Sequence, residues 1–177
     1  MKSRLVIFDA DVIIGAFATN LWDSLVDRFD IRVTSIVLHS EVFFFENKDG
    51  TRVSIDLKSY VARGKVTELS ASAEEIAALT DKVNPNLLNR IDDGEQEALA
   101  LLLTGRFDDH LFCTKDTRAI KALGSLSLGA FGISLEELLA QIGMRNKIPD
   151  PSYSKSAFEL KKAQGLQEQA MFLRKKS

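Results

Sequence analysis

Two apolar segments of this sequence are each followed by an acidic side chain. Asp9 comes directly after residues 5–8, and Asp116 comes shortly after residues 111–114. Both segments are short, continuous and rich in β-forming residues, which is typical of strands covered on both faces in a parallel sheet. Because the carboxyl ends of parallel strands meet at one edge of the sheet, where ligands bind in open α/β folds, we expect the two carboxylates to lie close together.

Glu41 is an acidic residue within an apolar, helix-forming stretch. The stretch opens at Ser35, directly after a second predicted strand at residues 31–34, so we expect Glu41 near the same edge of the sheet. Taken alone, a glutamate on a helix is more often a solvated surface residue. Its weight as a candidate ligand comes from the other acidic positions.

A third group of acids opens the helix that is predicted to start at Asp93. Residues 92–97 read DDGEQE, and an apolar run follows them. Glu97 stands past the first cap positions and next to this run, so we expect its side chain to point inward along a buried helix. Glu95 is the second choice for this position, and Asp93 is a further candidate.

These positions together predict a site for a divalent metal. Carboxylates are the hard oxygen ligands that Mg²⁺ and Mn²⁺ prefer, and the expected set is Asp9, Glu41, Glu97 and Asp116. Such a site suits phosphodiester cleavage, because bound ions can activate a water and stabilise the leaving oxygen. Thr114 could add a hydroxyl that hydrogen-bonds a metal-bound water or a phosphate oxygen.

Helix capping is the competing explanation for these acids. Asp9 and Asp11 precede one predicted helix and Asp116 precedes another, and acids in such places stabilise the amino terminus of a helix. Asp93, with Gln96 three residues later, matches a capping box. Two strands that both end in a carboxylate nevertheless favour a metal site, with Asp11 in a supporting or capping role.

The segments that hold these acids alternate between strands and helices. Asp49-Gly50, between apolar and alternating residues at 43–57, predicts a β-hairpin insertion. Further helices are expected at residues 11–29, 73–83, 93–104, 116–123 and 135–142, with a short strand at 130–133. The fold class is therefore α/β, a three-layer α/β/α domain with a central, mostly parallel sheet. The domain spans residues 1–148, and residues 149–177 form a basic tail or a loosely amphipathic helix.

Composition limits the classes to which the protein can belong. Its 177 residues, 45% apolar and 27% charged, suit one compact domain. A net charge of −2 creates no global positive field, so nucleic acid would have to be bound by a local patch or through metal ions. Cys113 is the only cysteine, which gives no support for a disulfide or a thiolate zinc site. No apolar run is long enough for a signal peptide or a membrane span, so we expect a cytoplasmic protein without a membrane partner.

Four segments, taken in order, resemble the PIN-domain ribonucleases, including the VapC-type toxin nucleases. They are LVIFDADVII (5–14), the stretch 35–41, GEQEALAL (94–101) and FCTKD (112–116). The resemblance extends over about residues 5–142. The hairpin and the tail are additions to the minimal pattern of the family.

The resemblance implies a metal-dependent endoribonuclease acting on single-stranded RNA. In this family the four acidic positions, here Asp9, Glu41, Glu97 and Asp116, bind Mg²⁺ or Mn²⁺. As a mechanism we expect Asp9 and Asp116 to bridge or flank the metal, Glu41 and Glu97 to complete its shell or orient a water, and hydroxide to attack phosphorus in line. Many members are toxins of toxin–antitoxin pairs, which implies a homodimer and an antitoxin protein as partners. Lys115 and Arg118, beside Asp116, are candidates for contacts with the RNA backbone.

Two rival functions are consistent with the same residues. The segment VIFDADV also matches the opening of haloacid-dehalogenase-type phosphatases, in which Asp9 would be the nucleophile and Asp11 the acid/base. The later acids fit that family poorly, because Asp92 and Asp93 do not directly follow a predicted strand. A catalytically inactive PIN-like binding module is the second rival, since fold does not establish activity.

Overall fold

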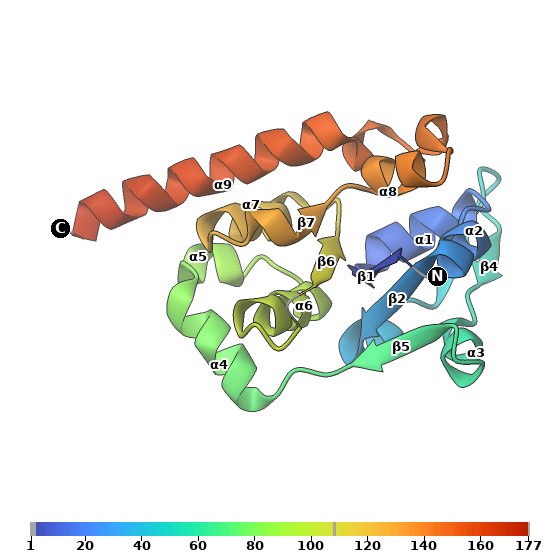
Figure 1. Cartoon of the computed structure of the whole chain (residues 1–177), viewed down its shortest axis with the longest axis horizontal. Coiled ribbons are helices and arrows are strands. Elements are labelled where there is room, and N and C mark those ends of the chain that lie inside the picture. The colour runs from blue at the N-terminus through green and yellow to red at the C-terminus, as the bar shows by residue number, and fades with distance from the viewer. Residues whose placement is uncertain (1–2, 108, 177) are drawn as a thin grey trace.

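The computed structural model describes residues 3–107 and 109–176 and has a five-stranded parallel sheet at its centre (Figure 1). In spatial order the strands are β5 (Val66–Leu69), β2 (Phe29–Thr34), β1 (Ser3–Phe8), β6 (His110–Cys113) and β7 (Gly132–Ile133). Every neighbouring pair runs parallel. The predicted α/β class and parallel sheet are therefore confirmed.

Helices cover both faces of the sheet and bury its alternating side chains. Val6 and Phe8 of β1 belong to one apolar cluster and Ile7 belongs to the other, as the period of a strand requires. The first cluster includes residues of α1 (Ala10–Ala18), α2 (Trp22–Arg28) and α8 (Leu135–Gln141). The second includes residues of α4 (Ala73–Lys82), α5 (Pro85–Leu88), α6 (Asp93–Leu103) and α7 (Thr117–Ser125). The molecule is thus a three-layer α/β/α structure.

The strand order reverses between β1 and β6. From β1 the chain proceeds outward to β2 and β5 on one side, and later returns to β6 and β7 on the other. In open α/β sheets, the carboxyl ends of the strands at this reversal form the crevice where ligands bind. Phe8 pairs with Cys113, so Asp9 and Thr114 emerge side by side at this point.

The predicted hairpin is present, but it is shorter than the sequence pattern indicates. Strands β3 (Phe44–Glu46) and β4 (Arg52–Ser54) pair antiparallel around Asp49-Gly50. The alternation of apolar residues continues to Leu57, yet Leu57 begins helix α3 (Leu57–Ala62). The side chain of Asp56 caps this helix by accepting a hydrogen bond from the N–H of Ser59.

Sequence patterns did not predict α3 or strand β5. In β5 only Val66 and Leu69 are buried, while Thr67 and Glu68 are exposed, because the strand lies at the edge of the sheet. Its sequence therefore lacks the continuous apolar run that marks central strands. The remaining elements are a π-helix, η1 (Val37–Glu41), and three 3₁₀ turns, η2 (Gly129–Phe131), η3 (Arg145–Lys147) and η4 (Pro151–Tyr153).

The C-terminal segment forms one long helix, α9 (Lys155–Lys176), which packs on α7; Ser177 lies outside the described residues. The contact is close because it is made at glycines: a Cβ at Gly124 would overlap the carbonyl oxygen of Lys162, and one at Gly165 would overlap that of Lys121. Phe158 is buried, but other large apolar side chains of the helix are at least half exposed, namely Leu160, Leu166, Met171 and Leu173. The predicted tail helix is thus docked through glycines more than through an apolar stripe.

None of the helices within the described residues has the length and apolar character needed to cross a bilayer.

We expect Gly165→Ala to destabilise the protein, because the added methyl group has only backbone atoms of Lys121 to displace. Overpacking of this kind costs about 1–3 kcal/mol, more than the helix propensity gained by replacing glycine. Thermal unfolding measures the effect, with Gln164→Ala on the exposed neighbouring position as the control. Equal melting temperatures for the two variants would contradict the proposed close contact.

Candidate active site

An acidic cavity of about 590 Å³ lies at the carboxyl ends of β1 and β6. Its lining includes seven carboxylates: Asp9, Asp11, Glu41, Asp92, Asp93, Glu95 and Asp116. None of the described residues in the lining carries a positive charge. So much negative charge around one hollow requires compensation by cations or by protons.

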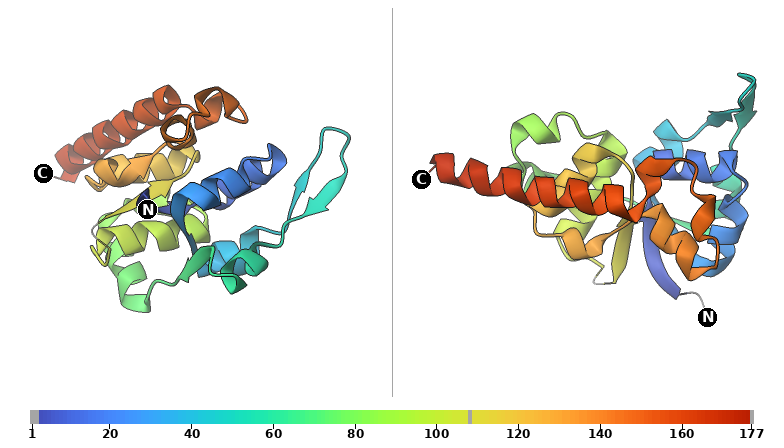
Figure 2. Two further views of the ribbon diagram at one scale, coloured as in Figure 1. Left: turned by 45° about the vertical axis from the view of Figure 1, so that its right-hand side comes forward. Right: turned by 90° about the horizontal axis from the view of Figure 1, so that it is seen from above.

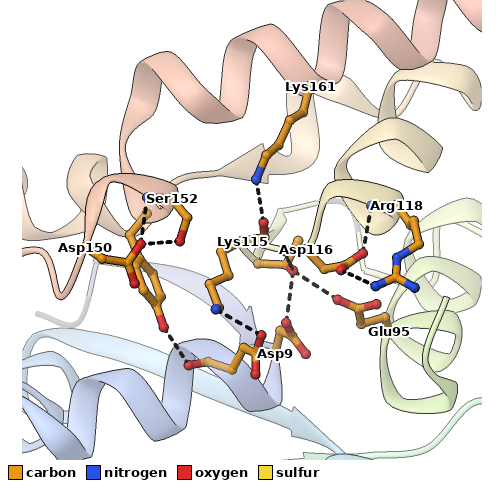
Figure 3. A network of polar contacts seen from close by, with 11 residues as sticks. Asp9, Glu95, Lys115, Asp116, Arg118, Asp150, Ser152 and Lys161 are labelled. Carbon is orange, nitrogen blue, oxygen red and sulfur yellow. Dashed lines mark hydrogen bonds and ion pairs between the residues drawn. The ribbon is translucent and has the colours of Figure 1, made fainter. Parts of the chain in front are cut away.

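The two most buried acids of the cavity are Asp9 and Glu95 (Figure 3), and the side chain of Thr114 contacts both of them. Its hydroxyl oxygen lies 3.0 Å from Oδ2 of Asp9 and 3.2 Å from Oε1 of Glu95. It also accepts a hydrogen bond of 3.0 Å from the N–H of Asp116. A threonine hydroxyl has only one proton to donate, so it cannot satisfy both carboxylates at the same time.

The second oxygen of Glu95, Oε2, is buried and has no hydrogen-bond partner. The whole residue is only 2% exposed, so water does not replace the missing donor freely. An unpartnered carboxylate oxygen in such a place is costly unless a cation or a proton is bound to it. Glu95 Oε2 is therefore the atom in the cavity that most clearly lacks a ligand.

The pKa values of Asp9 and Glu95 also indicate that this pair needs a bound proton or another cation. Burial raises the pKa of Glu95, and the nearby charges of Asp9 and Asp116 raise it further. Burial likewise raises the pKa of Asp9, although the hydrogen bond from Thr114 opposes the shift. Two carboxyls with raised pKa values in one cavity bind protons when no other cation is present, and a divalent ion competes with those protons.

Glu41 reaches the cavity from the last residue of the π-helix η1. The N–H of Val42 bonds to the carbonyl of Val37 over 3.2 Å, five residues back, which widens this turn. Oε1 of Glu41 accepts a hydrogen bond of 3.1 Å from the N–H of Gly94, in the first turn of α6. Isolated π-turns occur frequently at functional sites.

Gly94 permits this close approach of η1 to α6. A Cβ at this position would lie 2.5 Å from Oε2 of Glu41 and 2.6 Å from Cγ2 of Val37. The glycine is required by the absence of space and not by an unusual φ angle. The DDGEQE segment gave no indication of this role, because the residues that fill the space lie more than 50 positions earlier in the chain.

Asp116 does cap a helix, as the competing explanation holds. Its Oδ1 accepts hydrogen bonds from the N–H groups of Arg118 and Ala119, at 2.7 and 3.1 Å. Its other oxygen lies 3.3 Å from the guanidinium of Arg118. The residue also lines the cavity, so capping and a ligand role can coexist in one carboxylate.

Asp9 occupies the cap position of α1 without capping it. Its side chain makes no capping hydrogen bond to the helix and is directed instead to Thr114. Capping therefore does not explain this carboxylate. The predicted capping box at Asp93 is also absent, since Asp92 is the cap residue and the Gln96 amide donates to the carbonyls of Leu88 and Ile91.

The structure brings Glu95 into the cavity and places Glu97 outside it. Both are buried, but the carboxylate of Glu97 accepts hydrogen bonds from two backbone N–H groups, of Ile36 at 3.1 Å and of Ala71 at 3.0 Å. Glu97 thus connects α6 to the start of the η1 segment and to the loop before α4. The geometry favours Glu95, the second choice from sequence, for the third acidic position.

Two cations at the rim of the cavity, Lys115 and Arg118, are each paired with one of its acids (Figure 3). Lys115 Nζ lies 3.3 Å from Asp11, whose side chain is 55% exposed, and Arg118 is paired with Asp116. Lys161 of α9 donates a hydrogen bond of 2.8 Å to the carbonyl of Lys115. The C-terminal helix therefore contributes to the arrangement of this rim.

The donor set fits a divalent ion that prefers oxygen. Carboxylates of Asp9, Glu95, Asp116 and Glu41 surround one hollow, and the unpartnered oxygen of Glu95 lacks a cation. Within the described part of the chain, no three His, Cys, Asp or Glu side chains are already arranged to hold a metal. In the structure these carboxylates are engaged by other partners, Asp9 and Glu95 by Thr114, Glu41 by the N–H of Gly94 and Asp116 by Arg118.

Comparisons with known proteins identify no family for the chain: no family model matches it, and neither does any curated protein. The resemblance to the PIN-domain ribonucleases therefore stays a prediction from the sequence.

Separate substitutions of Glu95 and Glu97 should distinguish a metal ligand from a structural carboxylate. We expect Glu95→Gln to weaken Mn²⁺ binding at least about tenfold, because it removes a buried charge from the cavity. Glu97→Gln should leave Mn²⁺ binding within about twofold and lower the unfolding free energy by about 1–3 kcal/mol, since an amide cannot accept from both N–H groups. Calorimetric titration and thermal unfolding measure the two quantities. The reverse pattern would restore Glu97 as the ligand.

The pH dependence of stability should also reveal the buried pair. Burial raises the pKa of Asp9 to about 7 and that of Glu95 to about 10, so the stability associated with their protons is lost as pH rises from the ordinary carboxyl values to these raised values. Without divalent metal, the free energy of unfolding of Glu95→Gln should therefore rise relative to that of the wild type between about pH 6 and about pH 9. Tenfold tighter proton binding corresponds to about 1.4 kcal/mol, or roughly 3–5 °C in melting temperature. A constant difference between the two proteins across this range would contradict the assignment.

Proposed function

We propose that the protein is a Mg²⁺- or Mn²⁺-dependent endoribonuclease that hydrolyses phosphodiester bonds in single-stranded RNA. The observation that carries the proposal is the buried Asp9–Thr114–Glu95 group, with its shared hydroxyl and its unpartnered glutamate oxygen, at the reversal of the strand order. The choice of RNA as substrate rests on the resemblance of the sequence to PIN-domain ribonucleases.

Each side chain has a distinct part in this proposal. Asp9, Glu95 and Asp116 would hold the metal, with Glu41 completing the acidic set opposite them. When bound, such ions supply a more acidic water and stabilise charge on the leaving oxygen. Thr114 holds the Asp9 and Glu95 carboxylates toward each other, and so fixes the positions from which they act.

The rim cations would bind the phosphates that flank the scissile bond. Lys115 and Arg118 each lie within 3.3 Å of an acid of the cavity. Positive side chains in this position offset the repulsion between the acidic cavity and a polyanion. Backbone contacts of this kind position a nucleic acid without reading its sequence.

Cleavage of single-stranded RNA, with Asp9→Asn and Asp116→Asn as paired variants, tests the proposal. Both should lose at least about 100-fold in kcat/KM, because several kcal/mol of transition-state stabilisation depend on the metal. Asparagine caps helices as well as aspartate does, so Asp116→Asn should keep its melting temperature. Chelation of divalent metal should abolish cleavage.

Two results would overturn the proposal. Equal cleavage by wild type and both variants would identify a contaminating nuclease. Hydrolysis of phosphate monoesters, with an adduct on Asp9 in the presence of a phosphate analogue, would establish the phosphatase alternative. A homodimer and an antitoxin partner stay predictions of the resemblance, and a cytoplasmic location stays a prediction from the sequence.

A further inference from the structure

Among the described residues, large apolar side chains are strongly exposed in two places, on helix α9 and at the base of the β3–β4 hairpin. At the hairpin, Phe43 is 52% exposed and Phe44 is 38% exposed. Exposing two neighbouring phenyl rings is unfavourable in water, so their position calls for a ligand or a partner.

The two faces of the hairpin differ in their surroundings. Phe45 is half buried and packs against the core, while Phe44 lies on the opposite face, as strand alternation requires. Arg52 pairs with Glu46 across the hairpin, and its guanidinium carbon lies 4.4 Å from the centre of the Phe44 ring. The outer face thus presents an aromatic ring with a flat cation held over it.

The hairpin begins close to the acidic cavity. Phe43 follows Glu41 by two residues, and an extended residue spans at most about 3.6 Å, so its Cα is within about 7 Å of that of Glu41. Phe44 is within about 11 Å by the same argument. Strand β3 also contacts α1, the helix that follows Asp9, and Figure 2 shows the hairpin projecting on the side toward which β1 runs.

Unpaired nucleobases are the ligands that suit such a surface. Bases of single-stranded nucleic acid stack on aromatic side chains and on guanidinium planes, whereas duplex bases are already stacked on each other. Resting on the proposed nuclease function, we infer that Phe44 and Arg52 form a base-stacking platform. It binds an unpaired base close to the scissile phosphate and thereby selects single-stranded over double-stranded substrate.

Binding of a fluorescein-labelled single-stranded RNA, with Ca²⁺ replacing Mg²⁺ to limit turnover, tests the platform directly. Loss of one stacked base should weaken binding between about 5-fold and about 150-fold in Phe44→Ala. Phe44→Tyr keeps an aromatic ring and should bind as the wild type does, whereas Phe44→Leu should resemble Phe44→Ala. Leu160→Ala, which removes an apolar side chain of α9 that is even more exposed (62% against 38% for Phe44), is the control and should have no effect.

Hydrolysis of bis(p-nitrophenyl) phosphate, a diester without nucleobases, separates this inference from the proposed function. Phe44→Ala should hydrolyse it within about twofold of the wild-type rate while losing RNA binding. If neither the wild type nor the variants hydrolyse any diester, the proposed function fails. The RNA affinities of the Phe44 variants still decide whether the platform exists. Unchanged RNA binding in Phe44→Ala, or binding by Phe44→Leu that is as tight as that of Phe44→Tyr, overturns the platform.

Discussion

Two buried carboxylates, those of Asp9 and Glu95, share a single hydroxyl donor in the interior of this protein. The candidate site is built around this pair, which has fewer hydrogen-bond donors than acceptor oxygens. Thr114 can donate its proton to one of them at a time, and the second oxygen of Glu95 has no partner. Two buried like charges would repel each other strongly, which is why burial and neighbouring negative charges raise the pKa values of both carboxyls and favour a bound proton or another cation.

The structure around the pair keeps the remaining acids within reach of the same hollow. Glu41 is brought there by a π-turn and by the backbone N–H of Gly94, and the absence of a side chain at Gly94 makes the approach sterically feasible. Glu97 contributes from the other side of α6, where its carboxylate connects this helix to backbone groups of two distant segments. Acids of similar burial on one helix therefore serve different ends, one toward the cavity and one toward the framework.

The two additions to the sheet-and-helix core both bear on the cavity. Helix α9 packs on α7 through glycine contacts and supplies Lys161, which fixes the backbone at Lys115. The hairpin follows Glu41 in the chain and carries exposed aromatic rings close to the acidic cavity. Together they place cations and aromatic rings around a cavity whose described lining residues include neither. Cations and aromatic rings are the groups that bind the phosphates and bases of single-stranded nucleic acid.

The sequence by itself determined the α/β class, the parallel central strands, the hairpin and the positions of Asp9 and Asp116, because runs of apolar residues and turn signals act locally. It did not decide between Glu95 and Glu97. Residues two apart on a helix point about 200° away from each other, so the choice depends on how α6 is rotated against the sheet. The roles of Gly94, of Thr114 as a shared donor and of β5 as an edge strand were likewise decided by tertiary structure, since each depends on contacts between residues far apart in the chain.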